Sequence, residues 1–215
     1  MTYIKICGIT EKANALAVVE AGADFIGLVF APSRRQVTPP KAREIASAVK
    51  KSSAATRVVG VFVNAPNSQV NEFADFCALD WVQLSGDESW EYCQELKKAI
   101  IKVIHVSGGQ KTDEILADIE TGYELLPGKE LICLLDSRVG GAYGGTGQVF
   151  NWQLAKEVSV RFPVMIAGGL TPANVGQLVR EVQPWGVDVS TGVESNGLKD
   201  TSKIRAFVKA VRSTH

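Results

Sequence analysis

Two residues suited to acid–base chemistry stand at the ends of β-rich runs in the sequence. Cys7 comes near the end of Tyr3–Gly8, and Asp136 closes Leu131–Asp136 after five apolar residues. A carboxyl group at the end of an apolar strand must be paired, hydrogen-bonded or open to a polar pocket, and the glycine-rich segment that follows favours the pocket. Position alone leaves Cys7 open between a functional thiol and a small buried hydrophobe.

The two histidines of the chain are poor alternatives for this chemistry. His215 is terminal, and His105 stands in an apolar strand-like run, where a structural role is expected. Cys77, Cys93 and Cys133 fall within helical or strand interiors and are expected in the core. If the protein is an enzyme, its acid–base chemistry near neutral pH therefore rests on cysteine or carboxylates.

Two loops near the end of the chain have the composition of an anion site. Gly168-Gly169 follows one β-rich run, and Ser190-Thr191-Gly192 follows the next. Glycine lets backbone N–H groups approach a phosphate closely, and the two hydroxyls can add donors. A lone glycine pair often only turns the chain, but two such loops at equivalent places favour phosphate binding. The sequence has no lysine-bearing P-loop, which excludes a Walker-type nucleotide site.

Other polar residues stand close to the ends of these runs. Arg34 and Arg35 follow the second run. Of two adjacent loop arginines one is usually solvated, and the other can make a forked contact to a carboxylate or phosphate. Asp188, flanked by valines, is expected to contact a ligand or a neighbouring strand. Lys5 alternates with Cys7, which places both side chains on one face of a strand.

These positions belong to a strict alternation of β-rich runs and helix-like segments. Several runs are continuously apolar, as in parallel strands that are buried on both faces. The predicted strands are Tyr3–Gly8, Phe25–Phe30, Arg57–Val63, Trp81–Ser85, Ile100–Val106, Leu131–Asp136, Val164–Gly169 and Gly186–Thr191. The predicted helices are Lys12–Ala21, Lys41–Lys51, Asn67–Cys77, Glu88–Lys98, Lys111–Glu120, Trp152–Val158, Pro172–Val182 and Asp200–Arg212.

This alternation predicts an α/β fold, a single (β/α)8 TIM barrel that forms one catalytic domain over residues 1–215. An open doubly wound sheet is the competitor, because alternation alone does not distinguish the two. Eight strands in one short domain favour the closed barrel. In such barrels the site forms at the C-terminal ends of the strands, where the residues above would meet. The segment Ser137–Phe150, with five glycines, is expected to be an active-site loop.

Composition restricts the class of protein further. The chain has 215 residues, 46% of them hydrophobic, which suits one domain with a large core. Lys+Arg and Asp+Glu balance at 23 each, so nothing points to nucleic acid or an anionic membrane. The N-terminal residues 1–5 enter an apolar strand at once, so we expect no signal peptide, and no apolar stretch approaches the roughly 18–20 residues that a membrane helix needs. The cysteines lack C-x-x-C spacing, so we expect a cytoplasmic protein without zinc or disulfides.

Several motifs together resemble a known family. They run in order through nearly the whole chain: Lys5–Thr10, Gly27–Phe30, Ser33-x-Arg35, Val59–Asn64, Val82–Leu84, Leu134–Asp136, Tyr143–Gly147, Gly168–Leu170 and Val187–Glu194. The combination resembles phosphoribosylanthranilate isomerase, although any one motif alone would be weak. The resemblance implies the third step of tryptophan biosynthesis, an Amadori rearrangement without a cofactor. N-(5-phosphoribosyl)anthranilate becomes 1-(2-carboxyphenylamino)-1-deoxyribulose 5-phosphate.

The resemblance also implies how the acid and the base act. Asp136 would be the general acid that protonates the ribose ring oxygen, so that the ring opens to a Schiff base. Cys7, as a thiolate, would then remove the C2 proton. An apolar barrel mouth suits the acid, because low dielectric raises a carboxyl pKa. The thiol needs a nearby positive charge, which Lys5 or the iminium of the substrate can supply.

The binding residues follow from the same resemblance. Arg35 would hold the anthranilate carboxylate, with further substrate contacts at Gln83 and Asp188. Ser85 stands where the family usually has histidine, which alters a substrate contact but neither the acid nor the base. The phosphate would be held by glycines and hydroxyls of the loops, namely Gly145, Gly168, Gly169, Ser190, Thr191 and Gly192.

Two other interpretations remain open. Among related phosphosugar barrels, a histidine-pathway aminoaldose isomerase typically uses two aspartates, whereas the first strand here offers Cys7. Indole-glycerol-phosphate synthase needs a catalytic lysine and glutamates, which Lys5 alone matches poorly. A non-catalytic phosphosugar-binding barrel would bind its ligand without consuming it. In each case the expected partner is a small phosphorylated molecule, and the protein is a monomer or a homodimer.

Overall fold

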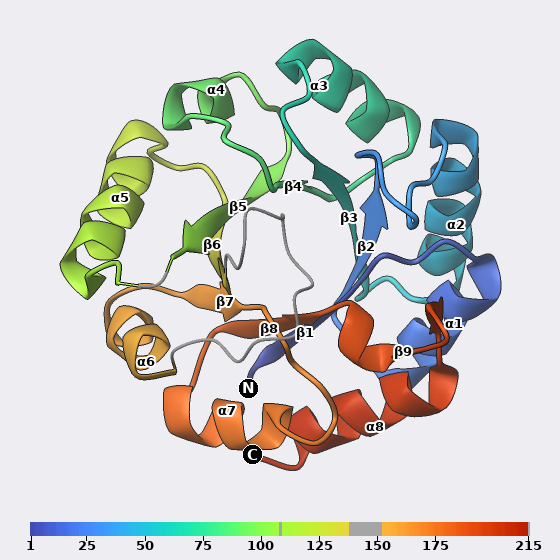
Figure 1. Ribbon diagram of the computed structural model, residues 1–215. Coiled ribbons are helices and arrows are strands. Elements are labelled where there is room, and N and C mark those ends of the chain that lie inside the picture. Colours follow the sequence, from blue (N-terminus) through green and yellow to red (C-terminus); the bar gives the residue numbers. More distant parts are fainter. Residues whose placement is uncertain (108, 138–151, 215) are drawn as a thin grey trace.

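The computed structural model describes residues 1–107, 109–137 and 152–214, and within them the chain folds as a closed barrel (Figure 1). Eight parallel strands follow one another around the barrel in chain order, and helices cover the outside. The last strand closes the barrel by pairing with the first, with Asp188 opposite Lys5. The predicted (β/α)8 barrel is confirmed, and the open doubly wound sheet is excluded.

The elements alternate as the sequence predicts. The strands are β1 Tyr3–Cys7, β2 Phe25–Val29, β3 Arg57–Phe62, β4 Trp81–Leu84, β5 Ala99–Val106, β6 Leu131–Ser137, β7 Val164–Ile166 and β8 Gly186–Val189. The helices are α1 Lys12–Ala21, α2 Pro39–Ser52, α3 Asn67–Phe76, α4 Trp90–Gln94, α5 Thr112–Leu125, α6 Trp152–Arg161, α7 Val175–Val182 and α8 Thr201–Arg212. After β8 come a 3₁₀ turn, Thr191–Val193, and a short hairpin of β9 Glu194–Ser195 and β10 Leu198–Lys199.

Several helices differ from their predicted bounds, and α4 and α5 show why; α4 also ends early, at Gln94 and not at Lys98. α4 begins at Trp90, not at Glu88, because the Glu88 carboxylate accepts hydrogen bonds from the backbone N–H groups of Asn64 (2.7 Å) and Gly86 (2.9 Å) and so belongs to the loop. α5 continues through Gly122 to Leu125. The Trp90 ring occupies the space that a side chain at Gly122 would need. That glycine therefore serves helix packing and does not end the helix.

α7 also begins later than predicted, at Val175 and not at Pro172. The Asn174 side chain accepts a hydrogen bond from the Thr171 N–H (2.8 Å) and donates one to the Gly169 carbonyl (3.0 Å). These bonds hold residues 171–174 as a turn that braces the loop after β7. The pair Thr171-Pro172 is typical of a helix start, but the contacts of Asn174 in this loop delay the start to Val175.

Alternation along the strands directs side chains into two separate cores. Ile4 and Ile6 point outward to the helices and belong to the large core between strands and helices. Inward-pointing residues such as Phe25 form a smaller cluster inside the barrel. On β1 the inward positions are Lys5 and Cys7, so the strand that starts the barrel brings a cation and a thiol into its interior.

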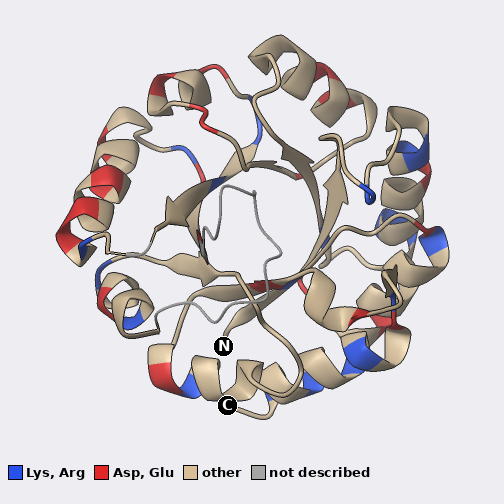
Figure 2. Ribbon diagram, in the orientation of Figure 1, with Lys and Arg blue, Asp and Glu red and all other residues tan. Residues whose placement is uncertain are grey.

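Charged residues gather mainly on the outer helices and their loops (Figure 2). Among the described residues, no helix is long and apolar enough to cross a membrane. The predicted active-site loop lies outside the described residues from position 138 onward, and Gly145 lies there with it.

Candidate active site

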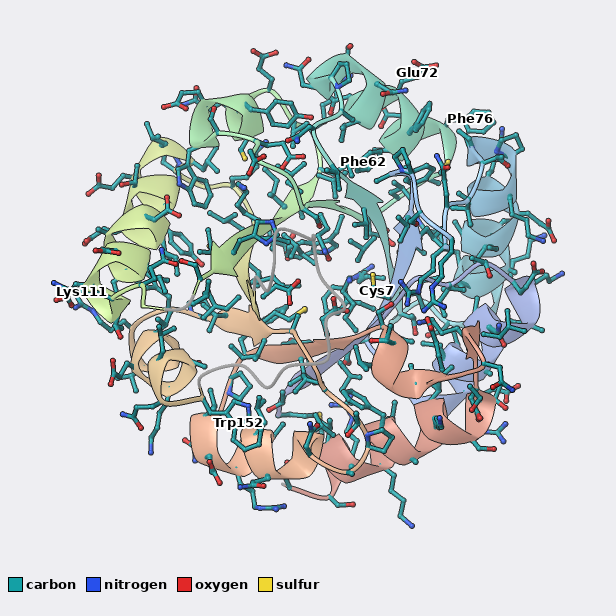
Figure 3. The ribbon with its side chains drawn as sticks, viewed as in Figure 1. Cys7, Phe62, Glu72, Phe76, Lys111 and Trp152 are labelled. Carbon is teal, nitrogen blue, oxygen red and sulfur yellow. The ribbon has the colours of Figure 1, made fainter. Side chains whose placement is uncertain are left out.

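A cavity of about 340 Å³ opens among the C-terminal ends of the strands. Every strand of the barrel contributes to its lining, either directly or through the loop that follows. The predicted site residues that line it are Cys7, Arg35, Gln83, Asp136, Gly168, Gly169, Asp188, Ser190 and Thr191. The cavity thus brings together nearly all the residues that the sequence singled out, from positions 7 to 191. Cys7 lies on the inner side of the ring of strands (Figure 3).

Lys5 links the thiol of Cys7 to the carboxylate of Asp188. Its side chain is fully buried, its Nζ lies 3.0 Å from Asp188 Oδ1, and its charge acts on the neighbouring Cys7 thiol. Gly27 on β2 makes room for this cluster, because a Cβ at that position would lie 2.8 Å from Cys7 Sγ and 3.2 Å from Lys5 Nζ. Asp188 therefore both faces the cavity and pairs with β1, as its position between two valines predicted.

The pKa values of Cys7 and Lys5 depend on two opposing effects, burial and the neighbouring charges. Burial raises the pKa of Cys7, Lys5 lowers it and Asp188 raises it again, and the pKa stays above its ordinary value. Burial lowers the pKa of Lys5, but Asp188 and Cys7 together hold it above its ordinary value. Both shifts favour a charged Lys5 and a neutral Cys7 thiol near neutral pH. The charge predicted beside the thiol is present, but alone it does not ionise Cys7.

Arg35 reaches the cavity through a forked contact with a residue of the β8 loop. Its Nε and Nη2 donate to the Glu194 carboxylate at 2.7 and 3.1 Å. Arg34 Nη2 also donates to Glu194 (2.6 Å), but its side chain is 54% exposed, against 20% for Arg35. Arg34 is thus the solvated arginine of the pair. Glu194 was not singled out as a partner, because residues 159 positions away along the chain meet only when the barrel closes.

Lys199 is a second buried cation that the sequence did not reveal. Its side chain is 2% exposed, and its Nζ donates to Glu194 (3.0 Å) and to the Ser190 carbonyl (2.7 Å). Burial lowers the pKa of Lys199, although Glu194 partly opposes this shift. Burial raises the pKa of Glu194, but hydrogen bonds from Arg35 and Lys199 bring it below its ordinary value. One carboxylate thus orients three cations next to the loop after β8.

The loops after β7 and β8 form the side of the cavity between Asp136 and Cys7. Gly168 and Gly169 have φ values of +92° and +65°, which favour glycine. The Ser190 hydroxyl donates to the Cys7 carbonyl (3.2 Å) and so ties β8 to β1. Gly192 lies behind the lining, where its missing side chain lets the β8 loop press against the Leu170 carbonyl. Its predicted contact with phosphate therefore remains a prediction.

The opposite side of the cavity carries a histidine that sequence reasoning assigned to structure. His105 points into the cavity from β5, and its Nε2 lies 3.1 Å from the Ser85 carbonyl oxygen. His105 and Asp136 are register partners on neighbouring strands. Gln83 is 5% exposed and donates through Nε2 to the Ser85 hydroxyl (3.0 Å). The signal for His105 was the two-residue period: it continues the inward row of Ile101 and Val103.

Within the described residues, no group of His, Cys, Asp or Glu side chains is arranged to hold a metal ion. The four cysteines are buried and are not joined in disulfides.

Comparisons with known proteins agree on one family. The model of the N-(5'-phosphoribosyl)anthranilate (PRA) isomerase family matches residues 4–210. A curated relative of that name from Dehalococcoides mccartyi is 47% identical over 212 residues, which cover 99% of this chain and 96% of the relative. The crystal structure of phosphoribosyl anthranilate isomerase from Thermotoga maritima superposes with a TM-score of 0.84 at 35% identity, covering 99% of this chain and 100% of that one.

A further structure of such an isomerase, in complex with reduced 1-(o-carboxyphenylamino)-1-deoxyribulose 5-phosphate, superposes with a TM-score of 0.81 at 34% identity. It covers 99% of this chain and 100% of that one.

Proposed function

Because the chain belongs to the N-(5'-phosphoribosyl)anthranilate isomerase family, we propose that its cavity converts N-(5-phosphoribosyl)anthranilate to 1-(2-carboxyphenylamino)-1-deoxyribulose 5-phosphate, with Asp136 as acid and Cys7 as base. Membership makes the protein an isomerase of tryptophan biosynthesis. One observation carries the assignment of the two residues: Asp136 on β6 and Cys7 on β1 line the same cavity, with the loops of β7 and β8 between them.

The lining suggests how the substrate lies. The phosphate sits between the loops after β7 and β8, where Gly168, Gly169 and Ser190 face the cavity. The aromatic ring extends towards the apolar side chains of β2 and β3, and its carboxylate meets Arg35. Glu194 occupies two of the five N–H donors of that guanidinium and holds it in place, which leaves donors for the carboxylate. A related isomerase binds the reduced product, which carries the same phosphate and carboxylate.

Ring opening is the first chemical step. Asp136 donates its proton to the ring oxygen while the bond from C1 to that oxygen breaks. The nitrogen lone pair forms the C1=N double bond, so the positive charge moves to an iminium group. This step needs the carboxyl group in its protonated form close to the sugar. Leu134 and Ala167, which also line the cavity, provide apolar surroundings beside Asp136.

Removal of the C2 proton follows. Burial raises the pKa of Cys7 more than the charge of Lys5 lowers it, which favours the neutral thiol. The iminium adds a second positive charge in a site of low dielectric, which favours the thiolate; the thiol proton passes to solvent. The thiolate then takes the C2 proton, the electrons of the C–H bond form the enolamine, and the enolamine tautomerises to the ketone. Lys5 therefore assists ionisation, and the substrate completes it.

A fluorescence assay that follows the loss of phosphoribosylanthranilate tests this proposal. Cys7→Ala and Asp136→Asn should each lower kcat by about 10²–10⁴-fold, the range for loss of general acid–base catalysis. Circular dichroism and thermal unfolding would show that both variants still fold. Substantial turnover by either variant would overturn the role of that residue. A wild-type protein that binds the product but never consumes the substrate would overturn the reaction itself.

A further inference from the structure

The β9–β10 hairpin fixes the position of Lys199 next to the loop after β8. Asn196 and Gly197 have φ values of +52° and +80°, and a two-residue hairpin turn with positive φ at both positions matches the twist of its strands. The turn sets Lys199 opposite Glu194 as register partners of β10 and β9. Asp200, the next residue, accepts two hydrogen bonds from the first turn of α8. The backbone of Lys199 is thus held between a hairpin and a capped helix start.

Three acceptors surround the amino group of Lys199. Its Nζ lies 2.7 Å from the Ser190 carbonyl oxygen, 3.0 Å from Glu194 Oε1 and 3.4 Å from the Ser190 hydroxyl oxygen. An ammonium group has three hydrogens to donate, so these contacts match its capacity. The side chain is 2% exposed, so water cannot readily take over a lost contact. Removing this side chain would release Ser190 and Glu194 from the same restraint.

The two partners of Lys199 belong to different parts of the proposed site. The Ser190 hydroxyl donates to the Cys7 carbonyl (3.2 Å), and Ser190 lines the cavity in the loop that would bind phosphate. Glu194 Oε1 also accepts from Arg35 Nε (2.7 Å), and Arg35 would bind the carboxylate of the aromatic ring. One amino group therefore connects the two places where the anionic ends of the substrate are expected.

We propose that Lys199 is a positioning residue that holds the loop after β8 and the Arg35 guanidinium at a fixed separation, so that both ends of one substrate fit. This inference rests on the proposed function. Lys199 is not among the described residues that line the cavity, so it acts through Ser190 and Glu194. Without Lys199, Glu194 would keep its bonds to Arg34 and Arg35 and lose the bond across the hairpin. The carboxylate would stay paired while the loop after β8 was released.

Two small anions probe the two places separately and without turnover. Inorganic phosphate probes the loop after β8, anthranilate probes Arg35, and titration calorimetry gives both dissociation constants. We expect Lys199→Met to raise each constant about tenfold, as for one lost hydrogen bond. Lys203→Met is the matched control. Lys203 Nζ donates to the Glu194 carbonyl oxygen (2.7 Å) but its side chain is exposed, so both constants should stay within about twofold of the wild type.

A double variant separates positioning from a general loosening of the barrel. Glu194→Gln breaks the link to Arg35 and should weaken anthranilate binding about tenfold. Because Lys199 reaches Arg35 through Glu194, the double variant Lys199→Met/Glu194→Gln should bind anthranilate no more weakly than the weaker single variant. Losses that add in the double variant would overturn the proposal, since a general loosening predicts additive losses.

The proposal is also overturned if folded Lys199→Met binds both anions as the wild type does, or loses affinity for only one of them. Circular dichroism checks the fold, and if Lys199→Met fails to fold, Lys199→Gln, which keeps an amide donor, is compared in the same way. Wild-type protein that binds both anions with this dependence on Lys199 but never consumes phosphoribosylanthranilate would contradict the proposed function alone.

Discussion

The Lys5–Cys7–Asp188 cluster predicts both the rank order and the size of the Cys7 pKa shifts in a set of variants. Lys5 lowers the pKa of Cys7, and Asp188 raises it to a smaller extent, against a large rise from burial. Removing these charges singly and together should therefore rank the Cys7 pKa as Asp188→Asn lowest, then wild type, then the double variant Lys5→Met/Asp188→Asn, and Lys5→Met highest. A thiol that did not sense this pair would give four equal values.

The size of each step follows from the contacts. A charge within about 4–6 Å shifts a pKa by about 1–3 units, and each unit is a tenfold change in the thiolate fraction at fixed pH. Lys5→Met should thus slow thiolate reactions at neutral pH by at least about tenfold. Asp188→Asn leaves Lys5, which is fully buried, without its carboxylate, and should cost about 3–5 kcal/mol of stability. The double variant removes both charges and should lose much less.

Alkylation by iodoacetamide at a series of pH values measures the thiolate of Cys7, which faces the cavity. Cys7→Ser in each background corrects for the three other cysteines, which are buried. Urea unfolding of the same proteins gives their stabilities. If Lys5→Met reacted at the same midpoint pH as the wild type, the charge of Lys5 would have no bearing on the thiol. If the double variant were less stable than Asp188→Asn, the cost would not come from an unpaired lysine.

Two more predictions concern binding and stability. Glu194→Gln should raise KM about tenfold and change kcat less than about threefold, because Arg35 loses the carboxylate that orients it. Arg34 is the exposed partner of Glu194, so the control variant Arg34→Ala should change KM less than about twofold. Equal effects of the two variants in steady-state kinetics would contradict this prediction. Burial raises the pKa of Cys133 from 9.0 to about 12, so above pH 9 the unfolded chain loses this proton while the folded chain keeps it. Unfolding free energy should fall by about 1.4 kcal/mol per pH unit from this residue between pH 9 and 12, and urea titrations of Cys133→Ala should show a shallower fall than those of the wild type.

Sequence periodicity predicted the fold because the signals were local and repeated. Apolar strands and helices alternate eight times, and each unit is read from its own residues. Errors arose where distant contacts decide an element's length. α4 starts late because Glu88 is held by Asn64, and α5 runs on because Trp90 fills the space at Gly122. A window of sequence contains neither partner.

The candidate site divides in the same way. Position at the strand ends left the role of Cys7 open, and the family resemblance added the prediction that Cys7 and Asp136 act at one site; both residues line one cavity, because inward residues at the same end of a barrel meet. The partners that tune those residues were not predictable. Lys199 and Glu194 reach the site through the β9–β10 hairpin, whose short strands lack a periodic pattern. His105 stands between isoleucine and valine and was therefore assigned a structural role; only the barrel shows that its side chain lines the cavity.

The order of the strands accounts for where the proposed acid, base and binding residues lie in the cavity. β6, β7, β8 and β1 are consecutive around the barrel and carry Asp136, the glycine loops, Asp188 and Cys7. The remaining strands and their loops contribute Arg35, Gln83 and His105 to the same lining. In the proposed roles, acid and base lie on either side of the loops that would bind phosphate, so holding the phosphate would also set the sugar between them. Polar changes on β4 and β5 would then alter which molecule fits without moving the proposed acid and base, and serine at position 85, where the resemblance leads us to expect histidine, would be a change of this kind.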